Sequence, residues 1–248
     1  MALQGRPYAE RMMGLLSDLA AQPQFEDDPH PLLTAREISK IGVIVITPDR
    51  GLTGGLNTSV NRFAAQHILQ SGHEAEVVAV GKKARDFFAR TSNLKAVFTD
   101  IGDRPSVDVV TPIAKVMVDE YLEGNIDAVF VIYSKYINTT VQKPESIAIL
   151  PVQPAELESK DKVGYIYEPD SSEVLSELVP RYIEMEIYHS ILESIASEQS
   201  ARMVAMRNAT DNAIEMKSDL TLEMNKVRQE SITSELLDIV GGVAAVEA

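Results

Sequence analysis

Apolar and polar positions alternate in two different ways along the chain. Up to about residue 152, short apolar runs of strand length are separated by segments with helical spacing. The run at 41–46 is apolar throughout, which is typical of a strand covered on both faces. Further strands are predicted at 75–80, 95–99, 128–136 and 146–152. Strands that alternate with helices predict a small α/β domain with a mainly parallel sheet, in which the last two strands are close enough in sequence to pair antiparallel.

The C-terminal part has a different period. Residues 181–240 contain neither glycine nor proline, and the pair Gly241-Gly242 is predicted to end one long helix. Within it, steps of four and three alternate without error through ten positions, eight of them apolar: Tyr188, Leu192, Ile195, Gln199, Arg202, Met206, Ala209, Ala213, Met216 and Leu220. This spacing predicts a coiled-coil strand. Because a lone helix cannot bury such a seam, most of it must be covered by something else.

The N-terminal segment carries a second, short seam. Tyr8, Met12, Leu15 and Leu19 recur at steps of four, three and four, which predicts a helix over 7–21 of only about two heptads. Three proline residues and three acidic residues then mark a linker over 22–31. The chain therefore divides into a short coiled-coil helix at 1–21, an α/β globular domain at 22–172 and a long coiled-coil helix at 173–248.

Composition narrows the classes of function. There are 37 acidic and 23 basic residues, and a net charge of −14 argues against nucleic acid as a partner. The absence of cysteine excludes disulfides, thiolate nucleophiles and cysteine metal sites. No apolar run approaches the roughly 20 residues of a membrane span, so no transmembrane segment is expected. Charges within the first 20 residues also argue against a secretory signal, so the protein is expected to work where it is made.

The glycine-rich turn at 47–57 is the strongest candidate for chemistry. Gly51, Gly54 and Gly55 invite comparison with a phosphate-binding loop, but no Lys-Ser/Thr pair follows and the spacing fits neither a P-loop nor a dinucleotide fingerprint. We interpret the segment as a structural strand-to-helix turn. Its glycines allow positive φ and close packing, and Asn57 is a candidate helix cap.

The remaining polar residues predict no active site. The four histidines lack metal-ligand spacing, and Asp100 and Asp103 beside Gly102 are more typical of a solvated loop than of an acid/base pair. We therefore expect no catalytic residue, cofactor or metal.

Several segments resemble the γ subunit of F-type ATP synthases. The turn TPDRGLTGGLN at 47–57 is similar to that family's signature turn. Residues 197–212 (SEQSARMVAMRNATDN) and 225–236 (NKVRQESITSEL) resemble its long C-terminal helix. Shorter matches are RPYAE at 6–10 and YIYEPD at 165–170, so the resemblance covers essentially the whole chain.

The resemblance implies a rotor in a larger machine. The family's γ subunit is an asymmetric shaft inside the α3β3 hexamer, and its globular domain rests on the membrane c-ring beside the ε subunit. It couples ion flow to ATP synthesis or hydrolysis, while the α and β subunits do the chemistry. The implied location is peripheral, on the cytoplasmic face of a bacterial membrane.

The same resemblance implies the architecture. The family's fold is an α/β domain inserted between two helices of an antiparallel coiled coil, with a long, basic first helix. Only the last two heptads of that first helix are present here, so the chain is N-terminally shortened relative to the family.

Site residues follow from matched positions. The resemblance implies contacts with the β subunit at Arg202, Arg228, Gln229, Thr233 and Glu235, and it implies that Tyr165 and Glu168 face the c-ring. Arg202 also falls on the predicted seam, where a charge is costly unless paired. The alternatives are an arginine that reaches solvent, an ordinary polar helix face near 228–235, and a tyrosine-rich edge before a turn at 165–170.

Two other functions remain open on the residues alone. The chain could be an independent α/β enzyme with a helical dimerisation arm and a site at the glycine-rich turn, although the missing P-loop lysine argues against it. It could also be a structural protein that dimerises through its long helix.

Overall fold

The computed structural model describes residues 6–20, 30–90, 93–153 and 170–246. Its contacts divide the chain into unit 1, Met1–Arg202, and unit 2, Met203–Ala248. The helices and strands in chain order are α1 (Arg6–Ala20), η1 (Pro31–Leu33), β1 (Lys40–Ile46), α3 (Leu56–Ser71), β2 (Glu74–Val80), α4 (Lys82–Phe88), β3 (Asn93–Phe98), η2 (Val107–Val109), α5 (Thr111–Leu122), β4 (Ala128–Tyr136), β5 (Gln142–Leu150) and α6 (Ser171–Val246). The two short η elements are 3-10 turns.

Unit 1 contains a five-stranded sheet in the order β3-β2-β1-β4-β5. β1 pairs in parallel with both β2 and β4, and β2 pairs in parallel with β3. β5 runs antiparallel to β4 from Tyr136↔Gln142 to Val129↔Leu150. These pairings confirm the predicted mainly parallel sheet and the antiparallel last pair.

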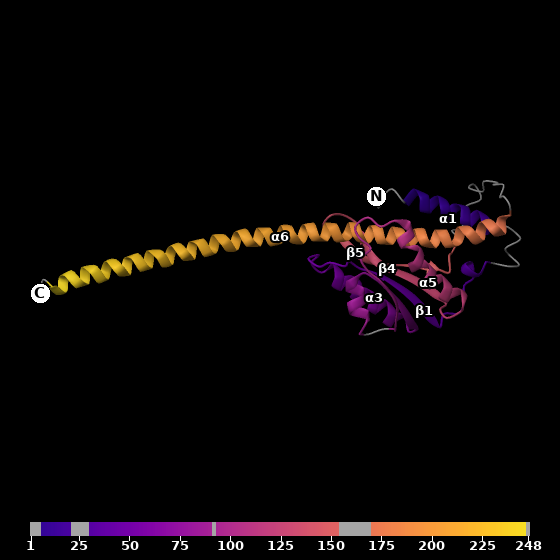
Figure 1. Cartoon of the computed structure of the whole chain (residues 1–248), viewed down its shortest axis with the longest axis horizontal. Coiled ribbons are helices and arrows are strands. Elements are labelled where there is room, and N and C mark those ends of the chain that lie inside the picture. The colour runs from indigo at the N-terminus through magenta and orange to yellow at the C-terminus, as the bar shows by residue number, and fades with distance from the viewer. Residues whose placement is uncertain (1–5, 21–29, 91–92, 154–169, 247–248) are drawn as a thin grey trace. The chain divides into compact units, whose positions relative to one another are not determined.

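Both faces of the sheet are covered, because successive strand residues point to opposite sides. Ile44 and Ile46 of β1 belong to one apolar cluster with residues of α1, α5 and α6. Ile41, Val43 and Val45 belong to a second cluster with residues of α3 and α4. α3 and the first part of α6 accordingly lie on opposite sides of the sheet (Figure 1). This double coverage explains why β1 is apolar at every position but its first.

The part of α6 in unit 1 buries a different stripe from the predicted seam. Val179, Ile183, Ile187 and Ile191 are buried against the sheet at steps of four. The seam positions Tyr188, Leu192 and Ile195 are only half buried, and Gln199 is exposed. The predicted register is therefore wrong here, because a sheet face and not a single helix covers this stretch, and it selects a broader stripe than a coiled-coil partner does.

The limits of α6 also differ from the prediction. The helix begins at Ser171, contains Pro180, and continues through Gly241 and Gly242 to Val246. Proline removes one backbone hydrogen bond, but buried residues on both sides of it, Val179 and Tyr182 among them, hold the helix on the core. The two glycines lower helix propensity by about 1 kcal/mol each without ending the helix.

The short N-terminal helix joins the same core. Met12, Leu16 and Leu19 of α1 are buried in the cluster that also contains Leu175 and Val179 of α6. Leu15, which we predicted for the seam, is only half buried, and the side chain of Tyr8 lies outside the described residues. α1 therefore packs against the start of α6 through a seam that partly differs from the predicted one.

Unit 2 is the C-terminal part of α6. Every residue at 206–242 is exposed, and this includes large apolar side chains such as Met216 at 64% and Leu220 at 58%. Large apolar side chains that the chain itself leaves exposed are typical of a surface that another molecule covers. In the described segments, no helix is both long enough and apolar enough to cross a bilayer.

We expect hydrogen exchange in the isolated chain to separate the two units. Amides in unit 2 should exchange much faster than those of β1 and β4, because a helix without tertiary packing opens locally at little cost. Exchange of the monomeric chain, read by mass spectrometry, measures this difference. Protection along 206–242 equal to that of β1 would contradict the exposure of this segment.

Candidate functional site

The glycine-rich turn between β1 and α3 is shaped by its backbone. Gly54 has a φ of +59° and Leu52, which is exposed, has a φ of +65°. Gly51 and Gly55 have ordinary φ values, and a Cβ added at Gly51, Gly54 or Gly55 would touch nothing within 4 Å. Only Gly54 thus needs the freedom of glycine, and close packing explains none of the three.

Asn57 does not cap the following helix, contrary to the prediction. The N-cap is Gly55, and Asn57 lies in the first turn of α3, where its Nδ2 donates to Thr53 Oγ1 at 3.3 Å. The side chain therefore bonds back to the turn instead of to the first free N–H groups of the helix.

Two residues before the glycines fasten the turn to its neighbours. Asp49 accepts one hydrogen bond from the Lys82 backbone N–H and another from the Asp100 backbone N–H, both at 2.9 Å. The Thr47 hydroxyl oxygen accepts the Ala84 backbone N–H at 2.7 Å. These bonds join the ends of β1, β2 and β3, and hydrogen bonds to a charged acceptor such as Asp49 are each worth about 1.5–3 kcal/mol.

Gly81 is the tightest point of this junction. Its φ is +99°, and a Cβ added there would lie 1.9 Å from the Thr47 carbonyl oxygen. The Gly81 N–H donates to the Phe98 carbonyl at 2.7 Å. Only glycine fits between β1 and β3 at this position.

Asp100 is paired, whereas Asp103 is not. Lys82 Nζ donates to Asp100 Oδ1 at 2.6 Å, and this hydrogen bond holds the pKa of the exposed Asp100 carboxyl below its ordinary value. Asp103 is exposed and has no ion pair among the described residues. The two aspartates thus form no acid/base pair, in agreement with their interpretation as loop residues.

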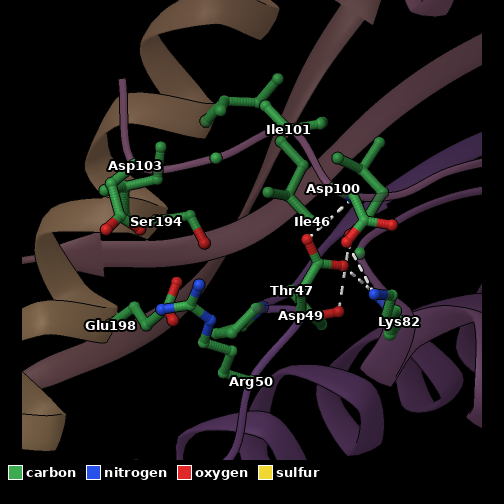
Figure 2. Close-up of a pocket in the computed structure, with 16 residues that line it drawn as sticks. Ile46, Thr47, Asp49, Arg50, Lys82, Asp100, Ile101, Asp103, Ser194 and Glu198 are labelled. Atoms are coloured by element: carbon green, nitrogen blue, oxygen red, sulfur yellow. Dashed lines mark hydrogen bonds and ion pairs between the residues drawn. The ribbon is translucent and has the colours of Figure 1, made fainter. Parts of the chain in front are cut away.

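A cavity of about 260 Å³ lies between this junction and α6. Thr47, Asp49, Arg50 and Lys82 form one side, and Ser194 and Glu198 of α6 face them (Figure 2). It opens at the carboxyl ends of the parallel strands, where α/β proteins commonly bind ligands. Among the described residues no group of three or more His, Cys, Asp or Glu side chains is placed to hold a metal ion.

Arg202 is tied down within its own helix. Its Nη2 donates to Glu198 Oε1 one turn earlier, and its Nη1 donates to Gln199 Oε1 at 3.3 Å. The Glu198 side chain is almost fully buried and that of Arg202 is about one-fifth exposed. The charge on the predicted seam is thus compensated inside the chain by a partly buried ion pair.

Two glutamates of α6 are covered by other residues of unit 1: Glu193 is buried and Glu186 is partly buried. Burial and the charge of Glu193 raise the pKa of Glu186 above its ordinary value. Burial, followed by the charge of Glu193, also raises the pKa of Tyr133, and burial together with Glu186 raises the pKa of Tyr182. Keeping Glu186 ionised at neutral pH therefore costs stability.

We expect Glu186→Gln to stabilise the protein at pH 8 but not at pH 4. Because the folded-state pKa of Glu186 is raised, its contribution is complete below the unfolded-state value near 4.5 and is lost as the pH rises through the folded-state value. Glutamine removes that loss. Denaturant unfolding at both pH values measures the difference, with the exposed Glu177→Gln as a control of the same chemistry. A gain for Glu186→Gln that is the same at pH 4 and pH 8 would contradict this origin.

The other residues with predicted contacts lie on unit 2. Arg228, Gln229, Thr233 and Glu235 are all exposed, and the Thr233 hydroxyl donates to the Gln229 carbonyl at 2.8 Å. They are brought together with one another by helical spacing but not with the cavity. Tyr165 and Glu168 lie outside the described residues.

The sequence is similar to named proteins along almost the whole chain. A family model described as ATP synthase matches residues 1–246. The chain is 51% identical over 245 residues to the ATP synthase gamma chain of Dehalococcoides mccartyi strain 195, covering 98% of this chain and 86% of that protein. It is 44% identical to the ATP synthase gamma chain of a Roseiflexus species, covering 97% of this chain and 84% of the other. The chain belongs to the ATP synthase γ-chain family.

Solved structures share the fold of this γ chain. A chain of the Euglena gracilis mitochondrial ATP synthase, solved as an OSCP/F1/c-ring assembly, aligns with a TM-score of 0.63 at 18% identity and covers 99% of this chain and 89% of that one. A chain from the central stalk and c-ring of the Tetrahymena thermophila mitochondrial enzyme aligns with a TM-score of 0.59 at 21% identity, covering 84% and 99%. At these identities the match supports the fold: a sheet domain with a long C-terminal helix.

Sequence reasoning on the signature turn of the γ chain selected its glycines and Asn57, but not the residues that fasten the turn to its neighbours. Thr47, Asp49 and Gly81 form the junction, and none of them was selected. A signal was present, since an apolar strand followed by Thr-Pro-Asp is typical of side-chain bonding to neighbouring backbone. The partners, Lys82, Ala84 and Asp100, are 33 to 51 residues away in sequence, so only the folded chain reveals them.

Proposed function

We propose that this γ chain is the central-stalk rotor of an F-type ATP synthase, which couples ion flow through the membrane sector to ATP synthesis or hydrolysis on the α and β subunits. The observation that carries the proposal is the exposure of every residue at 206–242 in a chain so similar to named γ chains. A shaft enclosed by α and β subunits needs such a face. An independent enzyme does not, and the relatives named above are γ chains.

The contacts with the β subunit are proposed for five residues. Arg228, Gln229, Thr233 and Glu235 present polar groups on exposed adjacent faces of α6, where they are available to bond to loops of the surrounding hexamer. Arg202 carries a guanidinium suited to bidentate pairing with carboxylates. In this proposal it pairs with acidic residues of the β subunits when the complex turns.

The remaining partners are proposed on the family resemblance. We infer that Tyr165 and Glu168 face the c-ring and that the ε subunit lies beside unit 1. The two coiled-coil helices would run antiparallel, as α1 packing against the start of α6 supports. The complex would sit on the cytoplasmic face of the bacterial membrane, with this chain as a peripheral subunit.

The chain itself is proposed to be non-catalytic, and its activity tests the proposal. The pure chain should hydrolyse no ATP, because the cavity beside the signature turn lacks a phosphate-binding Lys-Ser/Thr pair. Mixed with α and β subunits of the same organism, it should join a stable complex whose ATPase activity depends on all three. ATP turnover that stays with the chain through removal of α and β would contradict the rotor function and favour the enzyme.

A further inference from the structure

Two buried polar groups of α6 face the cavity beside the signature turn. Ser194 is 3% exposed and Glu198 is 8% exposed, and both line the cavity. One oxygen of Glu198 is bonded to Arg202. The Ser194 hydroxyl has no hydrogen-bond partner among the described residues, and Figure 2 shows it directed into the cavity. The Ser194 hydroxyl is not fully enclosed, so it is available for a hydrogen bond to a polar group that enters the cavity.

Arg50 is a cation that lines the same cavity as Ser194 and Glu198. It lies on the opposite wall, is exposed, and has no ion pair among the described residues. In Figure 2 its guanidinium extends from the signature turn toward Glu198. Lys82, the other cation of the lining, is already held by Asp100.

Among the described residues, Glu198 has its ion pair with one arginine, Arg202. If Arg202 leaves to pair with a carboxylate of a partner, the Glu198 side chain, which is only 10% exposed, remains without its counter-charge, which is unfavourable. Arg202 is then costly to release. A second cation in the same cavity removes that cost.

We propose that Arg50 replaces Arg202 on Glu198. The Arg50 guanidinium moves into the cavity and donates to the Glu198 carboxylate and the Ser194 hydroxyl, which its planar array of N–H donors can reach together. Arg202 is thereby free for an acidic partner. Arg50 acts as a positioning residue, and the use of the freed Arg202 on the β subunit rests on the proposed function.

The first test uses the full chain alone and a double-mutant cycle. Arg50→Gln and Arg202→Gln should each lower the melting temperature slightly, since either arginine can serve Glu198. Together they should lower it by at least ~3 °C more than the sum of the two. The excess should vanish when Glu198→Gln is also present, because a neutral amide needs no cation. A double variant that fails to fold where both single variants fold counts as the same excess.

The matched control is Arg62→Gln, an exposed arginine of α3. Its effect should add to that of Arg202→Gln without excess. If the losses of melting temperature for Arg50→Gln and Arg202→Gln simply add, as they do for the control, the replacement of Arg202 by Arg50 is overturned. This holds whatever the assembled complex does.

The second test uses the complex with α and β subunits and the membrane sector. Protons pumped per ATP hydrolysed should fall several-fold for Arg50→Gln, with hydrolysis largely retained, and Glu198→Gln should restore the ratio. If the chain alone shows the excess but Arg202 variants pump normally, the contact with the β subunit is wrong and the replacement stands. A third outcome is that Arg202 variants pump poorly while Arg50→Gln pumps normally, with or without Glu198→Gln. The proposed role of Arg50 in releasing Arg202 would then be wrong.

Discussion

Replacing Gly81 with alanine is expected to destabilise the protein more than any other single methyl group added in the signature-turn junction. The new Cβ would lie 1.9 Å from the Thr47 carbonyl oxygen, and the φ of +99° is one that alanine avoids. Backbone strain of about 1–3 kcal/mol adds to an overpacking cost of about 1–3 kcal/mol, giving a loss of roughly 4 kcal/mol. Denaturant unfolding of the full chain, followed by far-UV circular dichroism, measures this loss in the transition in which unit 1 unfolds.

Gly51→Ala is the matched control for this prediction. Gly51 lies in the same turn system, has an ordinary φ, and offers open space to a Cβ. Its free energy of unfolding should change by less than about 1 kcal/mol, in either direction. Equal losses at the two positions would mean that the close approach of Thr47 to Gly81 does not exist in the protein.

Reversing the charge of Arg202 is expected to have the largest effect on coupling. In the proposed complex, Arg202→Glu turns an attraction for acidic groups of the β subunits into repulsion, and it also sets a second carboxylate beside Glu198. We expect protons pumped per ATP hydrolysed to fall at least several-fold. Arg207→Glu, a change at an exposed position five residues after Arg202, should cost far less.

A charge swap separates the two consequences of Arg202→Glu. The variant that combines Glu198→Arg with Arg202→Glu rebuilds the internal ion pair in reverse, so the melting temperature should return toward that of the wild type. Pumping should stay low, since position 202 still presents the wrong charge to the β subunits. Recovery of both properties by the swap would show that Arg202 serves only stability, and equal effects of Arg202→Glu and Arg207→Glu would argue against the contact.

The centre of the sheet could be predicted from sequence because β1 and the first part of β4 are apolar runs. β1 and β4 are covered on both faces, so most of their side chains contribute to one of the two apolar clusters. The antiparallel pairing of β5 followed from the short connection after β4. In both cases the information is local to the strand or its neighbour.

The burial of α6 could not be predicted from the same pattern. Apolar residues at helical spacing form both the seam through Tyr188 and Leu192 and the stripe through Ile187 and Ile191, which lies one position away. Which stripe is buried depends on the shape of the covering surface, a sheet in unit 1. In unit 2 no residue at 206–242 is buried, so the predicted seam through Met216 and Leu220 stays a prediction there.

The sequence predicted where the candidate site lies, but not which residues form it. The glycines of the signature turn drew attention because glycine is the residue of turns, yet only Gly54 among them needs its conformational freedom. The cavity depends on α6 crossing the ends of the strands, because Ser194 and Glu198 line it together with Thr47, Asp49 and Arg50. That crossing brings together residues about 150 positions apart, a distance over which sequence spacing carries no information.

Rotation of the chain within its complex is the most direct test of the rotor function. The complex of this chain with α and β subunits is fixed to a surface through the β subunits, and a gold particle is attached to unit 1. We predict that ATP drives continuous rotation of the particle in one direction, in steps that slow as ATP is diluted. Sustained ATP hydrolysis by the fixed complex, with the particle bound but stationary under low load, would contradict the account.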